Sequence, residues 1–275
     1  MNKKKIISTI LACAMLPFGG LISASAQDTK PTYVQLNPAD ASPFNNGEFQ
    51  GWGTALCWWA NRLGYSEKLT NAAAEAFFSD KGLGLDIARY NLGGGDDPTH
   101  NHINRSDSKV PGVYSDYKLS SDGKDVESIT YDITKDQNQL NIAKAALKAN
   151  PDLYFEGFSN SAPYFMTKTG CTSGGGTVNS DGTVTSNGNL NNLNDDMYDD
   201  FAKFIADATK LFKDNGIEFK SYSPMNEPDT DYWGYGSSKQ EGCHFDPGTS
   251  QSKMITETRK ALDNAELTDV LVAGM

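Results

Sequence analysis

The chain has 275 residues and a formal net charge of −11, with 24 lysines and arginines against 35 aspartates and glutamates. Such an acidic chain, without a basic stripe, is unsuited to nucleic acid or to an anionic membrane surface, and it suits a neutral partner such as a polysaccharide. Aromatic residues make up 11% of the chain, and several lie beside Gly, Asn and Asp in predicted loops, which favours stacking against sugar rings.

Residues 1–26 have the pattern of a signal peptide. A run of three lysines at 3–5 precedes a mostly apolar stretch at 6–22, and Ala24-Ser25-Ala26 is a small-residue cleavage site. No later segment is apolar for long enough to span a bilayer. We therefore expect an exported protein, secreted or periplasmic. Cys13 loosely resembles the modified cysteine of a lipoprotein, so a surface lipoprotein is the less favoured alternative.

Short apolar strands then alternate with amphipathic helices, which is typical of a parallel sheet with crossover helices. Long polar loops follow the strands, whereas the connections from helix to strand are short, and this asymmetry is typical of a (β/α)8 TIM barrel enzyme. In chain order the pattern predicts a strand at Phe49–Thr54, a helix at Glu67–Ser79, a strand at Leu83–Leu92, a helix at Asn138–Ala149, a strand at Leu153–Phe158, a helix at Asp195–Asn215, a strand at Glu218–Met225, a helix at Ser252–Ala265 and the opening of a strand at Asp269–Met275.

The predicted barrel is incomplete. A closed barrel needs about eight strands, and the pattern supplies five. The sequence ends on the apolar run Val270–Met275, and an unpaired strand is a poor place for a natural terminus. We therefore expect the chain to be the N-terminal portion of a longer protein.

Three cysteines follow the predicted signal peptide, and export permits one disulfide. Cys171 and Cys243 lie in Gly-rich loops after predicted strands and are the preferred pair, whereas Cys57 lies in an apolar run and is expected to be buried. His100 and His102 stand near acidic residues, but there is no third ligand at a convincing spacing. The sequence therefore predicts neither a metal site nor a cofactor.

A carboxylate at the tip of a predicted strand is the strongest catalytic signal. The strand at 218–225 ends on Asn226-Glu227-Pro228, and the C-terminal ends of barrel strands open into the active site. A glutamate there is a candidate proton donor for breaking a glycosidic bond. Arg89 stands near the tip of the second predicted strand, where a lone arginine usually needs a carboxylate partner.

Several aromatic residues are candidate platforms for sugar rings. Trp233 lies in a polar loop between Tyr232 and Gly234 and is the preferred one, whereas at least one of two adjacent tryptophans is expected to belong to the core. The candidates are Trp58, Trp59, Tyr164, Phe165, Trp233 and Tyr235.

Four segments stand out by their order and spacing: Gly51–Asn61, Leu85–Gly95, Ser159–Met166 and Ser223–Pro228, the last followed by Lys239–Cys243. Together they resemble glycoside hydrolase family 30, a family of exported retaining enzymes with a β/α barrel and an attached β-sandwich. Within the family, the string from Trp52 to Ala60 is most similar to the endo-β-1,6-galactanase branch, which cuts the β-1,6-linked galactan side chains of plant arabinogalactan proteins.

The resemblance implies a role for each matching residue. Glu227 matches the general acid/base, Asn226 the residue that binds the sugar 2-hydroxyl, and Arg89 an arginine that binds carboxylates in the site. The family's nucleophile is a second glutamate on the seventh strand, which has no counterpart in these residues, so we expect the chain alone to be inactive.

The resemblance also implies a domain organisation and leaves alternatives open. Residues 27–48 would belong to a β-sandwich side domain and residues 49–275 to a partial catalytic barrel. The alternatives are a relative acting on β-1,6-glucan, xylan or β-glucosides, and a non-catalytic glycan-binding fragment.

Overall fold

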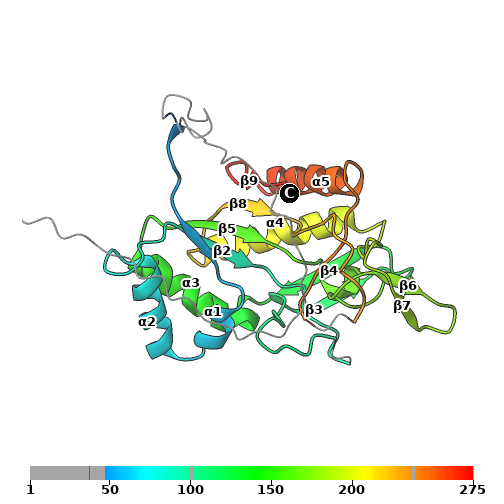
Figure 1. Ribbon diagram of the computed structural model, residues 1–275. Helices are drawn as coiled ribbons and strands as arrows, with labels where there is room; N and C mark the ends of the chain where they lie inside the picture. The colour runs from blue at the N-terminus through cyan, green and yellow to red at the C-terminus, as the bar shows by residue number, and fades with distance from the viewer. Residues whose placement is uncertain (1–36, 38–46, 100–101, 237–238, 275) are drawn as a thin grey trace, which may run out of the picture. The chain divides into compact units, whose positions relative to one another are not determined.

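A parallel sheet lies at the centre of the structure (Figure 1). The computed structural model describes residues 37, 47–99, 102–236 and 239–274, so the predicted signal peptide and nearly all of the predicted side-domain segment lie outside the described residues. Residues 49–275 form one unit. The sheet consists of β1 (Gly53–Ala55), β2 (Ile87–Asn91), β5 (Tyr154–Phe158), β8 (Phe219–Ser223) and β9 (Leu271–Val272), paired in that order.

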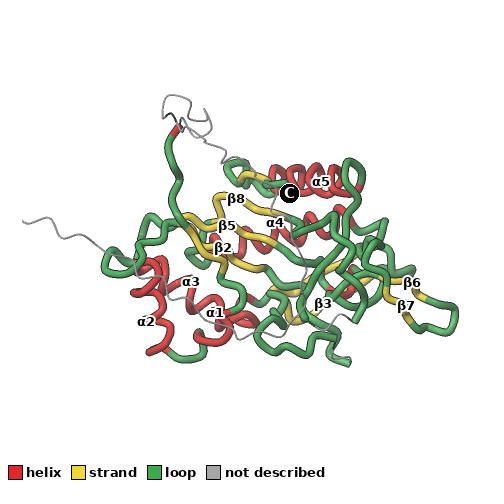
Figure 2. The backbone as a smooth tube through the Cα atoms, in the orientation of Figure 1, coloured by secondary structure: helices red, strands yellow, loops and turns green. Residues whose placement is uncertain are grey.

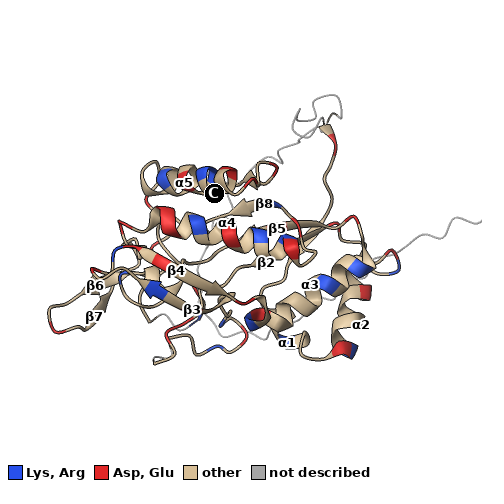
Figure 3. Ribbon diagram, turned by 180° about the vertical axis from the view of Figure 1, so that it is seen from behind, with Lys and Arg blue, Asp and Glu red and all other residues tan. Residues whose placement is uncertain are grey.

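Helices connect successive strands of the sheet. Figure 3, seen from behind, shows α3, α4 and α5 in front of the strands. The helices are α1 (Trp59–Leu63), α2 (Glu67–Phe78), α3 (Gln137–Ala149), α4 (Tyr198–Asp214) and α5 (Ser250–Asn264). All four predicted helices and all five predicted strands are confirmed, with boundaries that differ by a few residues, whereas α1 was not predicted. The sequence pattern thus captured the mixed α/β fold with a partial parallel sheet.

Helix α4 shows why these residues form helices against the sheet. Its apolar residues recur at helical spacing, so Phe201, Phe204 and Phe212 are buried, whereas the lysines of the helix are exposed. The helix stops at Gly216, as predicted, because this glycine adopts a φ of 84° and the next amide bonds back to the Phe212 carbonyl.

The core lies between the sheet and the helices. Tyr90 of β2 packs edge-on against Phe212 of α4, with ring centroids 4.7 Å apart. Its hydroxyl donates to Oδ2 of Asp136 across 2.8 Å, and Gln139 donates to the same oxygen across 2.6 Å. Asp136 is buried, and burial raises its pKa to about 7. Because side chains alternate along a strand, Arg89 projects from the face opposite to Tyr90.

Two antiparallel hairpins interrupt the predicted loops. One pairs β3 (Tyr114–Leu119) with β4 (Val126–Tyr131) and leads through a 3₁₀ turn, Ile133–Asp136, into α3. The other pairs β6 (Gly176–Val178) with β7 (Val184–Ser186). Figure 2 shows the long loops gathered at the end of the sheet where the hairpins lie, which is the C-terminal end of the strands. None of the described helices is both long and apolar enough to cross a bilayer.

Candidate active site

Arg89 joins the C-terminal ends of three neighbouring strands. It pairs in register with Glu156 of β5, and its Nε donates to Glu156 Oε1 across 2.5 Å. Its Nη1 donates to Oδ1 of Asn226, just after β8, across 3.2 Å. The guanidinium lies 3.7 Å from the ring centroid of Phe158. The predicted carboxylate partner of Arg89 is therefore present, and it is a residue that the sequence reasoning missed.

Glu227 follows Asn226 at the end of β8 in an unusual backbone conformation. Its φ is 47°, in the left-handed region, which costs a non-glycine residue about 1–3 kcal/mol and persists only where the surroundings hold it. Its carbonyl oxygen accepts the indole Nε1–H of Trp233 across 2.9 Å and the hydroxyl of Thr230 across 3.0 Å. The loop after β8 therefore fixes the backbone of Glu227, while its side chain is exposed.

The side chain of Glu227 contacts Tyr232, on the loop after β8. The hydroxyl of Tyr232 donates to Oε2 of Glu227 across 2.6 Å. This hydrogen bond, with the nearby negative charge, raises the pKa of Tyr232. The structure thus brings Glu227 next to Asn226, and Asn226 next to Arg89, in one cluster at the C-terminal end of the sheet.

The burial of Trp233 corrects the preference for it as a sugar platform. Its side chain is only 5% exposed. A Cβ added at Gly242 would lie 2.2 Å from its indole ring, so the ring is covered by that backbone. Trp233 therefore serves as a buried hydrogen-bond donor to the backbone of Glu227. The adjacent Tyr232, by contrast, is 52% exposed. The sequence could not show this burial because it depends on the tertiary structure. The loop after β8 folds back on itself and encloses the indole of Trp233, although its neighbours in sequence are polar.

The other aromatic candidates divide between core and surface. Trp59 donates its Nε1–H to the Ala55 carbonyl across 2.8 Å and packs against Phe77 of α2. It belongs to the edge of the core, and the expectation that one of the two tryptophans does so is confirmed. Phe165 is buried and stacks on Tyr117 at 3.9 Å, so it is not a platform.

Trp58, Tyr164 and Tyr235 remain candidate platforms. Trp58 is half-buried, with the guanidinium of Arg105 5.1 Å from its ring centroid. Tyr164 is half-buried and lines a cavity of about 690 Å³ beside Gly95, Tyr114 and Lys135. Tyr235 is half-buried, and its backbone amide donates to the Gly175 carbonyl.

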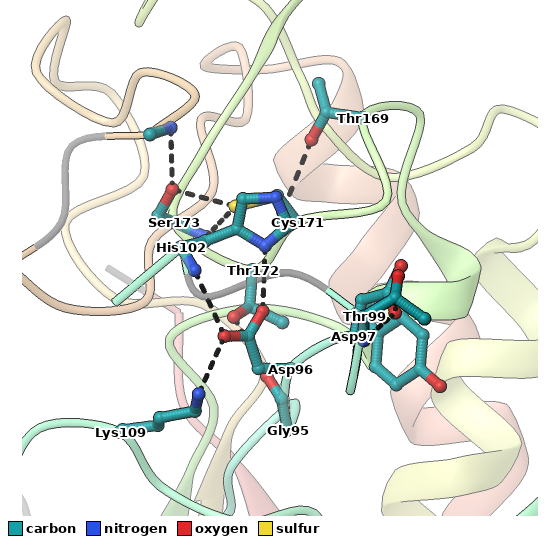
Figure 4. Close-up of polar contacts among 12 residues, drawn as sticks. Gly95, Asp96, Asp97, Thr99, His102, Lys109, Thr169, Cys171, Thr172 and Ser173 are labelled. Atoms are coloured by element: carbon teal, nitrogen blue, oxygen red, sulfur yellow. Dashed lines mark hydrogen bonds and ion pairs between the residues drawn. The ribbon is translucent and has the colours of Figure 1, made fainter. Parts of the chain in front are cut away.

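His102 is part of an ion-pair cluster, shown in Figure 4. Its Nδ1 lies 2.9 Å from Oδ1 of Asp96, whose other oxygen lies 3.2 Å from Nζ of Lys109. His100 lies outside the described residues. Among the residues placed in the structure, no three His, Cys, Asp or Glu side chains are grouped so that they could hold a metal ion.

The preferred disulfide is wrong. In the described part of the chain Cys57, Cys171 and Cys243 are all free thiols. The Sγ of Cys171 lies 2.9 Å from the hydroxyl oxygen of Ser173 (Figure 4), whereas the Sγ of Cys243 faces Asn191 Oδ1 at 3.6 Å. The two loops are neighbours, but each thiol points to its own polar partner.

Glu241 is a second carboxyl group near the site that sequence reasoning did not single out. It is 1% exposed, and its Oε1 and Oε2 accept the backbone N–H of Gly94 across 3.0 and 3.2 Å. Burial raises the pKa of Glu241 well above its ordinary value. It ties the loop after β8 to the turn after β2, which follows Arg89.

Comparison with known proteins identifies the family of this arrangement. The sequence profile of O-glycosyl hydrolase family 30 matches residues 44–268. An exo-β-1,6-galactobiohydrolase of Bifidobacterium longum is 29% identical over 84% of the chain, which spans 17% of that protein. An endo-β-1,6-galactanase of Hypocrea rufa is 29% identical over 86% of the chain, which spans 47% of that protein.

Solved structures share the fold. A conserved exported protein of Bacteroides fragilis has a TM-score of 0.65 and 26% identity, covering 82% of this chain and 43% of its own. An endo-β-1,6-glucanase has a TM-score of 0.57 and 19% identity, with 88% and 47% covered. The chain thus spans less than half the length of each of these four proteins.

Proposed function

The chain belongs to O-glycosyl hydrolase family 30, and from this premise we propose that the complete protein is a secreted retaining glycoside hydrolase that cleaves β-1,6-linked galactan. The observation that carries the proposal is the cluster in which Arg89 holds Asn226 beside Glu227. The names of the two relatives with 29% identity, one an exo- and one an endo-acting β-1,6-galactan enzyme, support the substrate.

In the proposed reaction Glu227 is the general acid/base. As the bond between the anomeric carbon and the glycosidic oxygen breaks, Glu227 gives its proton to the departing oxygen, and a second carboxylate bonds to the anomeric carbon. Water then attacks that carbon, releases the second carboxylate and returns a proton to Glu227. Glu227 projects into solvent at the end of β8, where a glycan could reach it.

Asn226 and Arg89 prepare the site for this chemistry. Because Oδ1 of Asn226 accepts from Arg89, its Nδ2 is directed elsewhere and can donate to the 2-hydroxyl of the sugar. That hydrogen bond strengthens in the transition state of glycoside hydrolysis. Arg89 also binds Glu156 and so connects β2 to β5 at the site.

The proposal extends to parts of the protein outside this cluster. Retention requires a second carboxylate about 5 to 5.5 Å from the acid/base. In the family it stands on the seventh barrel strand, and we expect no counterpart within these residues. We also propose that β1, β2, β5, β8 and β9 are five strands of a (β/α)8 barrel, and that residues 27–48 contribute to a β-sandwich.

The test uses the complete protein, a linear β-1,6-galactan and a β-1,6-glucan. We expect short galactose oligomers to be released from the galactan with retained anomeric configuration, and much slower cleavage of the glucan. Glu227→Gln should abolish release, whereas Glu257→Gln, on α5 and outside the site, should not. Preference for the glucan would replace the substrate assignment, and inversion or full activity of Glu227→Gln would overturn the mechanism.

A further inference from the structure

The contact between Tyr232 and Glu227 points to a role beyond general acid/base catalysis itself. The phenol donates to one specific oxygen, Oε2, across 2.6 Å. The backbone of Glu227 is already fixed at its carbonyl by Trp233 and Thr230. The backbone contacts do not fix the rotation of the carboxyl group. The hydroxyl of Tyr232 therefore restrains this rotation.

We propose that Tyr232 is a positioning residue that selects which oxygen of Glu227 carries the transferable proton, and that the hairpin β6–β7 holds Tyr232 in place. The inference rests on the proposed function. A neutral carboxylic acid has one hydroxyl and one carbonyl oxygen, and an oxygen that accepts a hydrogen bond acts as the carbonyl. With Oε2 engaged by the phenol, the proton resides on Oε1, which can face a glycosidic bond.

The same contact serves both halves of the reaction. While Glu227 is protonated, Tyr232 keeps the O–H aimed away from the loop. Once the proton has gone to the leaving sugar, Tyr232 stabilises the carboxylate, because a hydrogen bond to the charged form favours that form. Oε1 then accepts a proton from the attacking water. The donor itself stays protonated, since the contact with Glu227 raises the pKa of Tyr232.

The hairpin and the segment after Tyr232 form one layer of backbone. Gly188, just after β7, bridges Tyr232, and Gly175, just before β6, bridges Gly234. The amide of Gly175 donates to the Trp233 carbonyl across 2.9 Å, and the amide of Tyr235 donates to the Gly175 carbonyl across 2.8 Å. Backbone contacts with the hairpin therefore hold the segment from Tyr232 to Tyr235 in place.

Glycine at 188 permits this close approach. A Cβ at this position would lie 1.7 Å from the carbonyl oxygen of Asp231, the residue before Tyr232. An alanine there must push the hairpin and the Tyr232 segment apart. Gly174 makes a similar approach, since a Cβ there would lie 2.2 Å from the carbonyl oxygen of Trp233.

Other charged groups around the pair set its electrostatic environment. Asp229 lies on the same loop and adds negative potential at Tyr232. His244 packs behind the loop, with Nδ1 2.8 Å from the Thr230 carbonyl and Nε2 3.3 Å from Asp246. Arg89 reaches the pair through Asn226. None of these groups replaces the direct donor to Oε2.

The experiment compares the wild-type complete protein with Tyr232→Phe, Gly188→Ala and Glu227→Gln. Tyr65→Phe, at a residue 72% exposed, is the matched control. For each, kcat/KM is measured against pH on β-1,6-galactobiose and on a 2,4-dinitrophenyl β-galactoside. The sugar leaving group needs a proton from Glu227, whereas dinitrophenolate leaves without one. Thermal unfolding of each variant verifies that it is folded.

We expect Tyr232→Phe to lower kcat/KM on the disaccharide about tenfold, by loss of a hydrogen bond to a charged group. The alkaline limb of its pH profile should move to higher pH, because the ionised carboxylate has lost a donor. On the dinitrophenyl substrate the loss should be less than about twofold. Gly188→Ala should lower kcat/KM on the disaccharide and move the alkaline limb to higher pH, both by a smaller amount than Tyr232→Phe. Tyr65→Phe should match the wild type.

Contrary outcomes separate this inference from the proposed function. Equal losses on both substrates would assign Tyr232 a merely structural role, and an unchanged Tyr232→Phe would remove its role altogether. In either case a Glu227→Gln variant inactive on the disaccharide leaves the proposed function standing. If the wild type cleaves neither galactoside, or if Glu227→Gln equals the wild type on the disaccharide, both the function and this inference fall.

Discussion

Arg89 and Glu156 occupy paired positions on neighbouring parallel strands, and their side chains form an ion pair of 2.5 Å across that pairing. Both side chains are about three-quarters buried, with exposed fractions of 25% and 28%. The pair also places Arg89 within reach of Asn226, so the register of β2 against β5 sets the position of a residue after β8. Sheet pairing and site geometry are therefore coupled.

Arg89→Lys should lower kcat/KM on β-1,6-galactan by about tenfold or more. A lysine has a single ammonium group and lacks the planar fork with which Arg89 contacts Glu156 and Asn226 together while lying on Phe158. Steady-state kinetics of the complete protein measure this, with Arg62→Lys on α1 as the matched control. Activity equal to that of the control would show that the cluster does not depend on the guanidinium.

Asn226→Ala should lower kcat/KM about 100-fold on an aryl β-galactoside and much less on its 2-deoxy analogue. The amide that Arg89 orients is expected to contact the 2-hydroxyl, so removing either partner removes the same interaction. The rates of the wild type and of Asn226→Ala on the two substrates form a double-mutant cycle. Asn71→Ala, on α2, is the control. Equal losses on both substrates would place the role of Asn226 elsewhere in the site.

Asp136→Asn should flatten the dependence of folding stability on pH. Burial raises the pKa of Asp136 to about 7 in the folded protein, above its ordinary value of 3.8. Folding thus favours the neutral form of Asp136. The contribution of this group to the free energy of unfolding is complete below pH 3.8 and is lost as the pH rises through 7. The shift corresponds to about 4 kcal/mol across that window.

Urea unfolding at several pH values between 4 and 8 measures this effect. The wild type should lose stability relative to Asp136→Asn as the pH rises, whereas Asp214→Asn, at the exposed end of α4, should follow the wild type. Parallel curves for all three proteins would mean that Asp136 titrates alike in the folded and unfolded chains.

All three described cysteines should react as thiols once the protein is unfolded without reductant. In the folded protein alkylation should be slow, because burial raises the pKa of Cys57 to about 12 and that of Cys243 to about 11. Peptide mass spectrometry after iodoacetamide treatment, with and without urea, distinguishes the states. Recovery of the Cys171 and Cys243 peptides joined by a disulfide would show that these two cysteines are paired and not free.

The elements that sequence periodicity predicted are those with one strong apolar face. Helix α4 is an example, because its buried residues repeat at helical spacing. Strand β3 was missed because register irregularities between Tyr114 and Asp116, and between Lys118 and Leu119, break the alternation that identifies a strand. Strands β6 and β7 have three residues each and polar neighbours, so their apolar signal is too weak.

The residues of the candidate site divide in a similar way. Glu227, Asn226 and Arg89 stand at strand tips, where position alone indicates a site. Glu156 was missed because its importance depends on the register of β5 against β2, although a single charge within an apolar strand was a visible signal. Trp233 was misjudged because neighbours in sequence do not reveal that Gly242 folds over its ring.

The strand order has a consequence for how the protein folds during synthesis. Each strand of the sheet pairs with the one laid down before it, from β1 through β2, β5 and β8 to β9. A growing chain can therefore add each strand to a partner that the ribosome has already delivered. The hairpin β6–β7 is different, because it must wait for residues 232–235 before its bridges can form. The sheet can form progressively, whereas the hairpin β6–β7 reaches its final contacts beside Glu227 only after residues 232–235 have emerged.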